Sequence, residues 1–163
     1  MTQQITVAGP KLEPIRERLA WRADSDEFEA IRRLWINHSK AEDARDIPGL
    51  MATLTDDCVY ALWETGDRWE GKDGATRFYN ELLTAFPDIR FDLQDIVVGP
   101  QGVFEVADVT GTFSAEWIGV QPDQQPKAWR TVIYFPWDRE RRLFRGELVY
   151  RTPDLPGIKR RSD

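Results

Sequence analysis

The spacing of apolar residues changes from helical to alternating near Pro87, and this change constrains the fold more than any other feature. Before it, residues 28–38 and 78–86 repeat apolar side chains every three or four positions, as one face of a helix does. After it, apolar and polar residues alternate in segments separated by turn sequences such as GPQG and PDQQP. Helices followed by successive strands predict an α+β fold, with a curved antiparallel sheet wrapped around helices on one side.

About three helices are expected in the first half of the chain. The first begins after Asp24 or Ser25, either of which can cap it. Its inner face is expected to carry residues at helical spacing: Phe28, Ile31, Leu34, Trp35 and His38. A second short helix with an early proline, a strand over residues 56–63 and a third helix that Pro87 ends come next. His38, the single histidine, is therefore predicted to face the interior.

Composition favours one soluble domain and excludes several function classes. A chain of 163 residues, 41% hydrophobic and 31% charged, can build one core. We expect an N-terminal extension (1–23), a compact domain (24–152) and a C-terminal tail (153–163). The net charge of −6 argues against nucleic-acid binding, and no apolar run is long enough to span a membrane. One cysteine, Cys58, excludes an internal disulfide, so a cytoplasmic location is expected.

The order of these segments resembles the nuclear transport factor two-like superfamily, in its SnoaL-like branch. The resemblance is carried by AEDARDIPGLMATLTDDCVY, EGKDGATRFYNELLTAFPDIRF, TGTF and LFRGELVY, which span nearly the whole compact domain. It implies a cone, in which a bent sheet wraps around helices and leaves a deep apolar cavity. Members include polyketide cyclases, ketosteroid isomerases, limonene-type epoxide hydrolases, dehydratases and non-catalytic binding proteins, so the fold alone does not define the function.

The resemblance places His38 where ketosteroid isomerases keep a helix tyrosine that hydrogen-bonds the substrate oxyanion. Their aspartate base and their protonated aspartate are replaced here by Leu62 and Ile133. Phe113 stands where the cyclases often carry a histidine. Neither catalytic set is complete in this chain.

The epoxide hydrolases give a similar result. Tyr60 and Asp108 match a tyrosine and one aspartate of their catalytic set, but Val106 and Leu148 replace the arginine and the second aspartate. The resemblance also implies a homodimer through the convex face of the sheet. Val109 and Val149 are expected to contribute to that interface.

Strand alternation predicts which side chains point into the cone. Asp108 is placed on an inward face, where an unpaired carboxylate is costly, and the His38 imidazole is a suitable partner. We expect these two residues to form an acid/base pair, with Tyr60 or Tyr150 polarising a substrate oxygen. The predicted lining of the cavity is Trp35, Leu62, Phe104, Val106, Thr131, Ile133, Phe144 and Leu148.

The same alternation assigns Glu147 to the outer face, in a salt bridge with Arg145 or Arg130. The favoured function is a cofactor-independent enzyme of the cyclase, isomerase or dehydratase type, for which no metal is required. Its expected ligand is a small apolar carbonyl compound, cyclic or polyketide-like. The alternatives are a non-catalytic small-molecule-binding or assembly module of the same fold, and water activation as in the epoxide hydrolases.

Overall fold

Ten regular elements make up the part of the chain that the structure describes. A computed structural model of the protein describes residues 9–152. In chain order the elements are α1 (Ile15–Ala20), α2 (Ser25–Asp43), α3 (Ile47–Met51), β1 (Leu54–Leu62), β2 (Arg68–Glu70), α4 (Gly71–Ala85), β3 (Arg90–Gly99), β4 (Gly102–Thr112), β5 (Pro126–Asp138) and β6 (Leu143–Arg151). The predicted α+β class, with helices followed by long strands, is confirmed.

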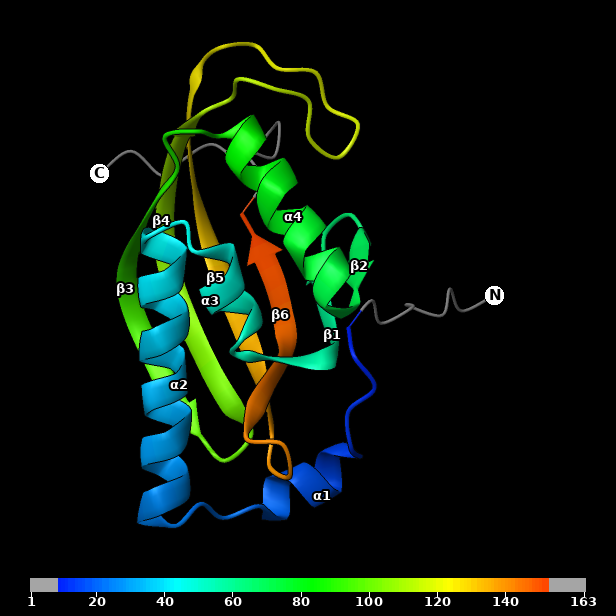
Figure 1. Ribbon diagram of the computed structural model, residues 1–163, viewed down its shortest axis with the longest axis vertical. Helices are drawn as coiled ribbons and strands as arrows, with labels where there is room; N and C mark the ends of the chain where they lie inside the picture. Colours follow the sequence, from blue (N-terminus) through cyan, green and yellow to red (C-terminus); the bar gives the residue numbers. More distant parts are fainter. Residues whose placement is uncertain (1–8, 153–163) are drawn as a thin grey trace, which may run out of the picture.

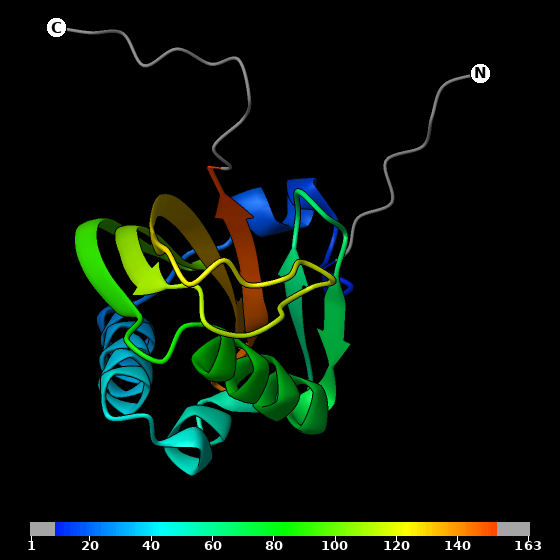
Figure 2. The same cartoon turned by 90° about the horizontal axis from the view of Figure 1, so that it is seen from above.

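All six strands form one sheet in the order β2-β1-β6-β5-β4-β3. Neighbouring strands are antiparallel except for β1 and β6, which run parallel. The sheet bends around α2, α3 and α4, while α1 lies on its opposite side (Figures 1 and 2). This is the predicted cone. It places the last strand of the chain at the centre of the sheet, facing the helices.

Local sequence explains where the main helix begins. The Asp24 carboxylate accepts a hydrogen bond from the backbone N–H of Glu27 at 2.8 Å, as an N-cap residue does. Two turns or more along the helix, Ile31, His38 and Ala41 are buried. The predicted inner position of His38 is therefore confirmed.

Strand β4 faces the core with the parity opposite to that predicted. Glu105, Ala107 and Val109 are buried, whereas Phe104 is exposed on the outer face. The strand carries apolar residues on both faces, so alternation alone does not identify the inner one. The ring of Phe104 stacks on Tyr134 of β5 instead, with centroids 4.3 Å apart.

Strand β6 changes its parity at Gly146. Its register with both neighbouring strands shifts near this residue, which has a φ of 120°. A β-bulge of this kind adds one residue to a strand and reverses the facing of those that follow. Phe144 therefore faces the core as predicted, but beyond the bulge Glu147 does so and Leu148 lies on the outer face.

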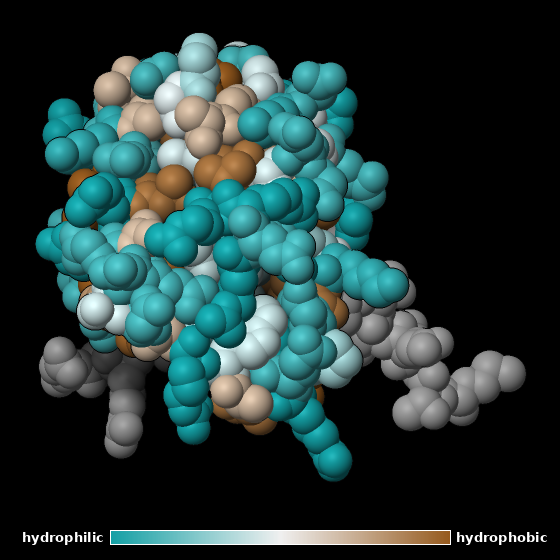
Figure 3. Space-filling model, turned by 60° about the horizontal axis from the view of Figure 1, so that its bottom comes forward, coloured by the Kyte–Doolittle hydropathy of each residue, from teal (hydrophilic) through white to brown (hydrophobic). Residues whose placement is uncertain are grey.

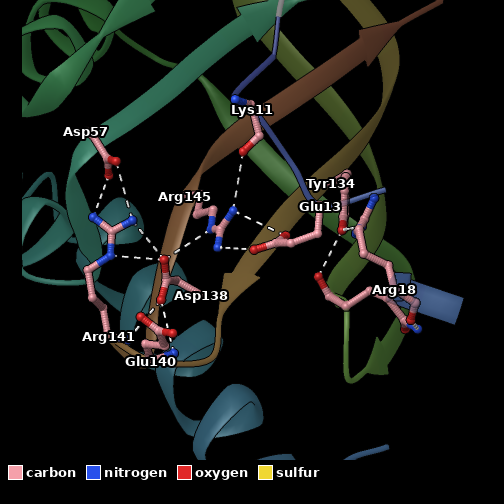
Figure 4. A network of polar contacts seen from close by, with 10 residues as sticks. Lys11, Glu13, Arg18, Asp57, Tyr134, Asp138, Glu140, Arg141 and Arg145 are labelled. Atoms are coloured by element: carbon pink, nitrogen blue, oxygen red, sulfur yellow. Dashed lines mark hydrogen bonds and ion pairs between the residues drawn. The ribbon is translucent and has the colours of Figure 1, made fainter. Parts of the chain in front are cut away.

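The chain segment before α2 packs against the outer face of the sheet. Leu12 contacts a small buried cluster there, formed by Val59, Ala61, Tyr134 and Leu148. Arg145 forms a salt bridge with Glu13 at 2.7 Å and another with Asp138 at 3.1 Å. Figure 4 shows this network between the N-terminal segment and the end of the sheet. The boundary at residue 24 stays a prediction, and the tail 153–163 lies outside the described residues.

The expected interface residues are not on the surface. Val109 on β4 is 0% exposed and Val149 on β6 is 5% exposed. Both side chains belong to the core, because they lie on the side of the sheet that faces the helices. That part of the dimer prediction is wrong, and the dimer itself stays a prediction. Seen from the end that carries α1, the surface is mainly hydrophilic with scattered hydrophobic patches (Figure 3). Within residues 9–152 no helix combines the length and apolarity needed to span a membrane.

Candidate active site

His38 lies at the centre of a buried polar network inside the cone. It is 1% exposed and packs edge-on against the ring of Phe135. Its Nδ1 is 2.7 Å from Thr53 Oγ1, and its Nε2 is 2.8 Å from Glu147 Oε1. The histidine is thus held from both ends, by Thr53 in the link between α3 and β1 and by Glu147 directly after the bulge in β6.

Hydrogen-bond geometry defines where the protons of this network lie. The Thr53 hydroxyl donates its only proton to the Leu50 carbonyl at 2.7 Å, so it must accept from His38 Nδ1–H. The short contact between Nε2 and Glu147 Oε1 then needs a second proton. A proton between Nε2 and Oε1 keeps the imidazole of His38 directed at the Glu147 carboxyl group.

Two tyrosines complete the network from β1 and α4. The hydroxyl groups of Tyr60 and Tyr79 donate to Glu147 Oε1 at 2.8 and 2.6 Å. Burial, and then the negative charge of Glu147, raise the pKa of both phenols well above the usual value, so both stay protonated. All these contacts converge on Oε1. Within the described part of the chain, no hydrogen bond reaches Oε2.

Glu147 also forms part of the wall of a mainly apolar pocket. The other polar residues of the wall are Glu42, Thr131 and Arg151. Its apolar residues are Leu62, Phe78, Leu82, Ile89, Phe91, Trp117, Trp129, Ile133 and Val149. The pocket therefore presents a carboxylate to a compartment bounded mainly by aliphatic and aromatic side chains.

A second acidic residue, Glu105, lines a second pocket together with His38 and Trp35. Glu105 is 7% exposed and accepts a hydrogen bond from the indole N–H of Trp35 at 2.8 Å. Burial, and then the charge of Glu147, raise the pKa of Glu105 to about 7. Glu42 lines both pockets, and burial together with the charges of Glu147 and Glu105 raises its pKa as well.

We expect Glu105→Gln to stabilise the protein at pH 8 but not at pH 4. The folded-state pKa of Glu105 is about 7 against 4.5 for an unperturbed glutamate. Between these values the unfolded chain releases the proton first, so the stability of the wild type falls as pH rises. The variant lacks this penalty, which reaches about 3 kcal/mol above pH 7. Urea unfolding of both proteins at pH 4 and pH 8 measures the free energies of unfolding. If the difference between variant and wild type is the same at both pH values, the prediction is wrong.

The structure does not bring His38 and Asp108 together. Asp108 faces outward on β4 and forms a bidentate pair with Arg130 of β5, at 2.7 and 3.0 Å. These hydrogen bonds lower the pKa of Asp108. The expected acid/base pair is thus corrected: the partner of His38 is Glu147, whose predicted outward position is wrong because of the bulge.

The other predicted site residues are divided between the pocket, the core and the outer face. Leu62, Thr131 and Ile133 line the pocket that contains Glu147, Trp35 lines the second pocket and Tyr60 belongs to the network. Phe144 is buried in the core. Tyr150 stacks on Trp63 and is 40% exposed, while Phe104, Val106 and Leu148 do not line either pocket. Their predicted catalytic or binding roles stay predictions.

Sequence reasoning missed Thr53, Tyr79 and Glu147. Tyr79 stands on the predicted inner face of α4, and only the fold brings its hydroxyl to Glu147. For Glu147 one local signal exists, since a glycine inside a strand often marks a bulge. Gly146 is that glycine.

Comparison with known proteins supplies the family. The sequence profile of the SnoaL-like polyketide cyclases matches residues 30–141, which is most of the chain. The chain belongs to the SnoaL-like polyketide cyclase family. No curated protein sequence matches it.

Solved structures of this SnoaL-like fold agree with the architecture. A candidate SnoaL-like polyketide cyclase from Jannaschia sp. CCS1 is 17% identical, with a TM-score of 0.69 over 80% of this chain and 91% of that one. AclR, a candidate hydroxylase from Streptomyces galilaeus, is 19% identical, with a TM-score of 0.61 over 77% and 90%. IdmH, a candidate polyketide cyclase from Streptomyces antibioticus, is 19% identical, with a TM-score of 0.60 over 74% and 91%. At these identities the likeness establishes the shared fold.

Proposed function

We propose that this SnoaL-like protein is an acid/base enzyme that removes a proton beside a carbonyl group of a small apolar compound. The observation that carries the proposal is the orientation of Glu147. Its Oε1 is held by His38, Tyr60 and Tyr79, while Oε2 has no hydrogen-bond partner among residues 9–152 and the residue lines an apolar pocket. A carboxylate oriented in this way is suited to act as a general base.

In the proposed reaction Glu147 Oε2 takes a proton from the carbon next to the carbonyl, and the electron pair of that C–H bond forms an enolate. Glu147 then holds that proton as a carboxylic acid and can give it back in the second half of the reaction. Return of a proton at another carbon gives isomerisation, and its transfer to a leaving hydroxyl gives dehydration. Attack of the enolate on a second carbonyl of the same molecule closes a ring, as a polyketide cyclase requires. None of these steps needs a cofactor.

His38 acts in this scheme as a positioning residue. It is buried, it orients the Glu147 carboxylate through Nε2, and its other nitrogen is occupied by Thr53. The mainly apolar walls lower the local polarity, which strengthens the interaction of the base with its substrate. The names of the structural neighbours, a candidate hydroxylase and candidate cyclases, agree with a small-molecule substrate.

A non-catalytic binding module is the second candidate. Its support is the closure of the network, since the nitrogens of His38 and the two tyrosine hydroxyls already have protein partners. The epoxide hydrolase alternative loses its support, because Asp108 pairs with Arg130 away from the pocket and Tyr60 is occupied by Glu147.

Hydrogen exchange on a model ketone separates the two candidates. 2-Tetralone is incubated with the protein in D₂O, and the loss of its C1 proton signal is followed by NMR. The enzyme proposal expects saturable exchange faster than that in buffer. Binding of the ketone without faster exchange would favour the binding module, and the absence of both would contradict both candidates.

A further inference from the structure

The indole N–H of Trp117 is a buried donor without an acceptor. Trp117 is 6% exposed and lines the same pocket as Glu147. Among the described residues, its Nε1 is one of three buried side-chain nitrogen or oxygen atoms that lack a hydrogen-bond partner. An indole can only donate, and a buried donor left unpaired costs free energy.

Three other tryptophans, buried or partly buried, show how this cost can be avoided. The indole nitrogens of Trp35, Trp69 and Trp137 each donate to a glutamate, at 2.8, 3.1 and 3.0 Å. Trp63 and Trp117 both depart from this pattern, and of the two only Trp117 lines the pocket that contains Glu147. The contrast indicates that its partner lies outside the protein chain.

The loop around Trp117 holds the ring in a defined place. The backbone groups of Trp117 and Val120 exchange hydrogen bonds of 3.1 and 2.9 Å across a two-residue turn. Both central residues have positive φ, 47° at Ile118 and 77° at Gly119. A β-branched residue rarely adopts this conformation, so the surroundings must hold the turn in place. The Arg151 guanidinium lies 5.0 Å from the centroid of the indole ring.

We propose that Trp117 Nε1–H recognises the ligand by donating to its carbonyl oxygen, while Glu147 addresses the neighbouring C–H bond. The inference rests on the proposed function for the choice of pocket, and it names the ligand class. The ligand is a neutral ketone, since a neutral donor suits a neutral acceptor. Among its described residues, the wall carries two acidic ones, Glu42 and Glu147, against one cation, Arg151. Arg151 pairs with Glu64, so the wall disfavours an anion. Trp117 is then a residue that determines specificity.

A pair of nearly isosteric compounds tests this. 2-Tetralone and 2-methylidenetetralin differ in C=O against C=CH₂, so only the first can accept the hydrogen bond. We expect Trp117→Phe to raise the Kd of the ketone about tenfold and to leave the Kd of the hydrocarbon within about twofold. Trp63→Phe is the matched control, because Trp63 Nε1 is also buried and unpaired but packs at the outer-face cluster. It is expected to change neither value.

NMR of ¹⁵N-labelled indole groups gives a second readout. The Trp117 N–H resonance is expected to move downfield on addition of the ketone and not on addition of the hydrocarbon. An unchanged ketone preference in Trp117→Phe, equal shifts with both compounds, a water that stays bound to Nε1 in the ketone complex, or no binding of either compound would each overturn the inference.

Two variants separate the test of ketone recognition by Trp117 from the test of the acid/base role of Glu147. In Glu147→Gln the preference for the ketone should persist although exchange is lost. Retained exchange in Glu147→Gln speaks against the acid/base role alone. Retained ketone preference in Trp117→Phe speaks against the recognition role alone.

Discussion

Glu147→Gln lowers the rate of 2-tetralone hydrogen exchange about 10²- to 10⁴-fold, the usual contribution of a positioned general base. An amide has almost the same shape as the carboxylate, and its oxygen can still accept from Tyr60 and Tyr79 at the Oε1 position. It cannot take up a proton from carbon. The variant therefore removes the chemistry and keeps most of the network.

Two controls belong with this measurement. Asp108→Asn alters the carboxylate that pairs with Arg130 on the outer face and should leave exchange unchanged. Circular dichroism and the Kd for 2-tetralone show whether Glu147→Gln keeps its fold and its pocket. A folded variant that binds the ketone and retains more than a tenth of the wild-type rate would remove Glu147 from the role of base.

Gly146→Ala has the largest expected effect on stability. Gly146 has a φ of 120°, and an added Cβ would lie 1.9 Å from the Val59 carbonyl oxygen and 2.7 Å from the Val59 nitrogen. These are backbone atoms of the parallel neighbour β1, at the centre of the sheet, so no side chain can move aside. We expect a loss of more than about 3 kcal/mol in the free energy of unfolding, because backbone strain and overpacking add. Urea unfolding measures it.

Gly66→Ala is the matched control. Gly66 also has a positive φ, of 80°, but nothing lies within 4 Å of the position of an added Cβ. Only the backbone penalty of about 1–2 kcal/mol applies there. Similar losses in the two variants would show that the bulge tolerates a side chain, and the account of how β6 turns Glu147 inward would then be wrong.

Local signals were sufficient for much of the fold. The Asp24 cap, the inner face of α2 with His38 and the inward alternation of β1 and β5 all act over a few residues. Tyr60, Leu62, Thr131 and Ile133 were placed inside the cone on this basis, and all four lie in the network or the pocket. The resemblance to the SnoaL-like branch depended on the order of such segments.

Long-range contacts were needed for the site. Strand β4 has apolar residues on both faces, so its composition does not identify the inner face. On the outer face, the ring of Phe104 stacks on Tyr134. Asp108 was assigned inward on that ambiguous strand. Thr53 and Tyr79 lie far from His38 in sequence and meet it only when α3 and α4 pack beneath the sheet.

The sequence by itself determined the α+β order of helices followed by a curved sheet and the inward place of its single histidine, because hydrophobic period, caps and turns act within a few residues. Only the tertiary structure decided which carboxylate the histidine meets. The bulge at Gly146 depends on how β6 pairs with β1 and β5 at the same time. One extra residue there turns Glu147 from the outer face to the pocket, and strand alternation cannot contain that information.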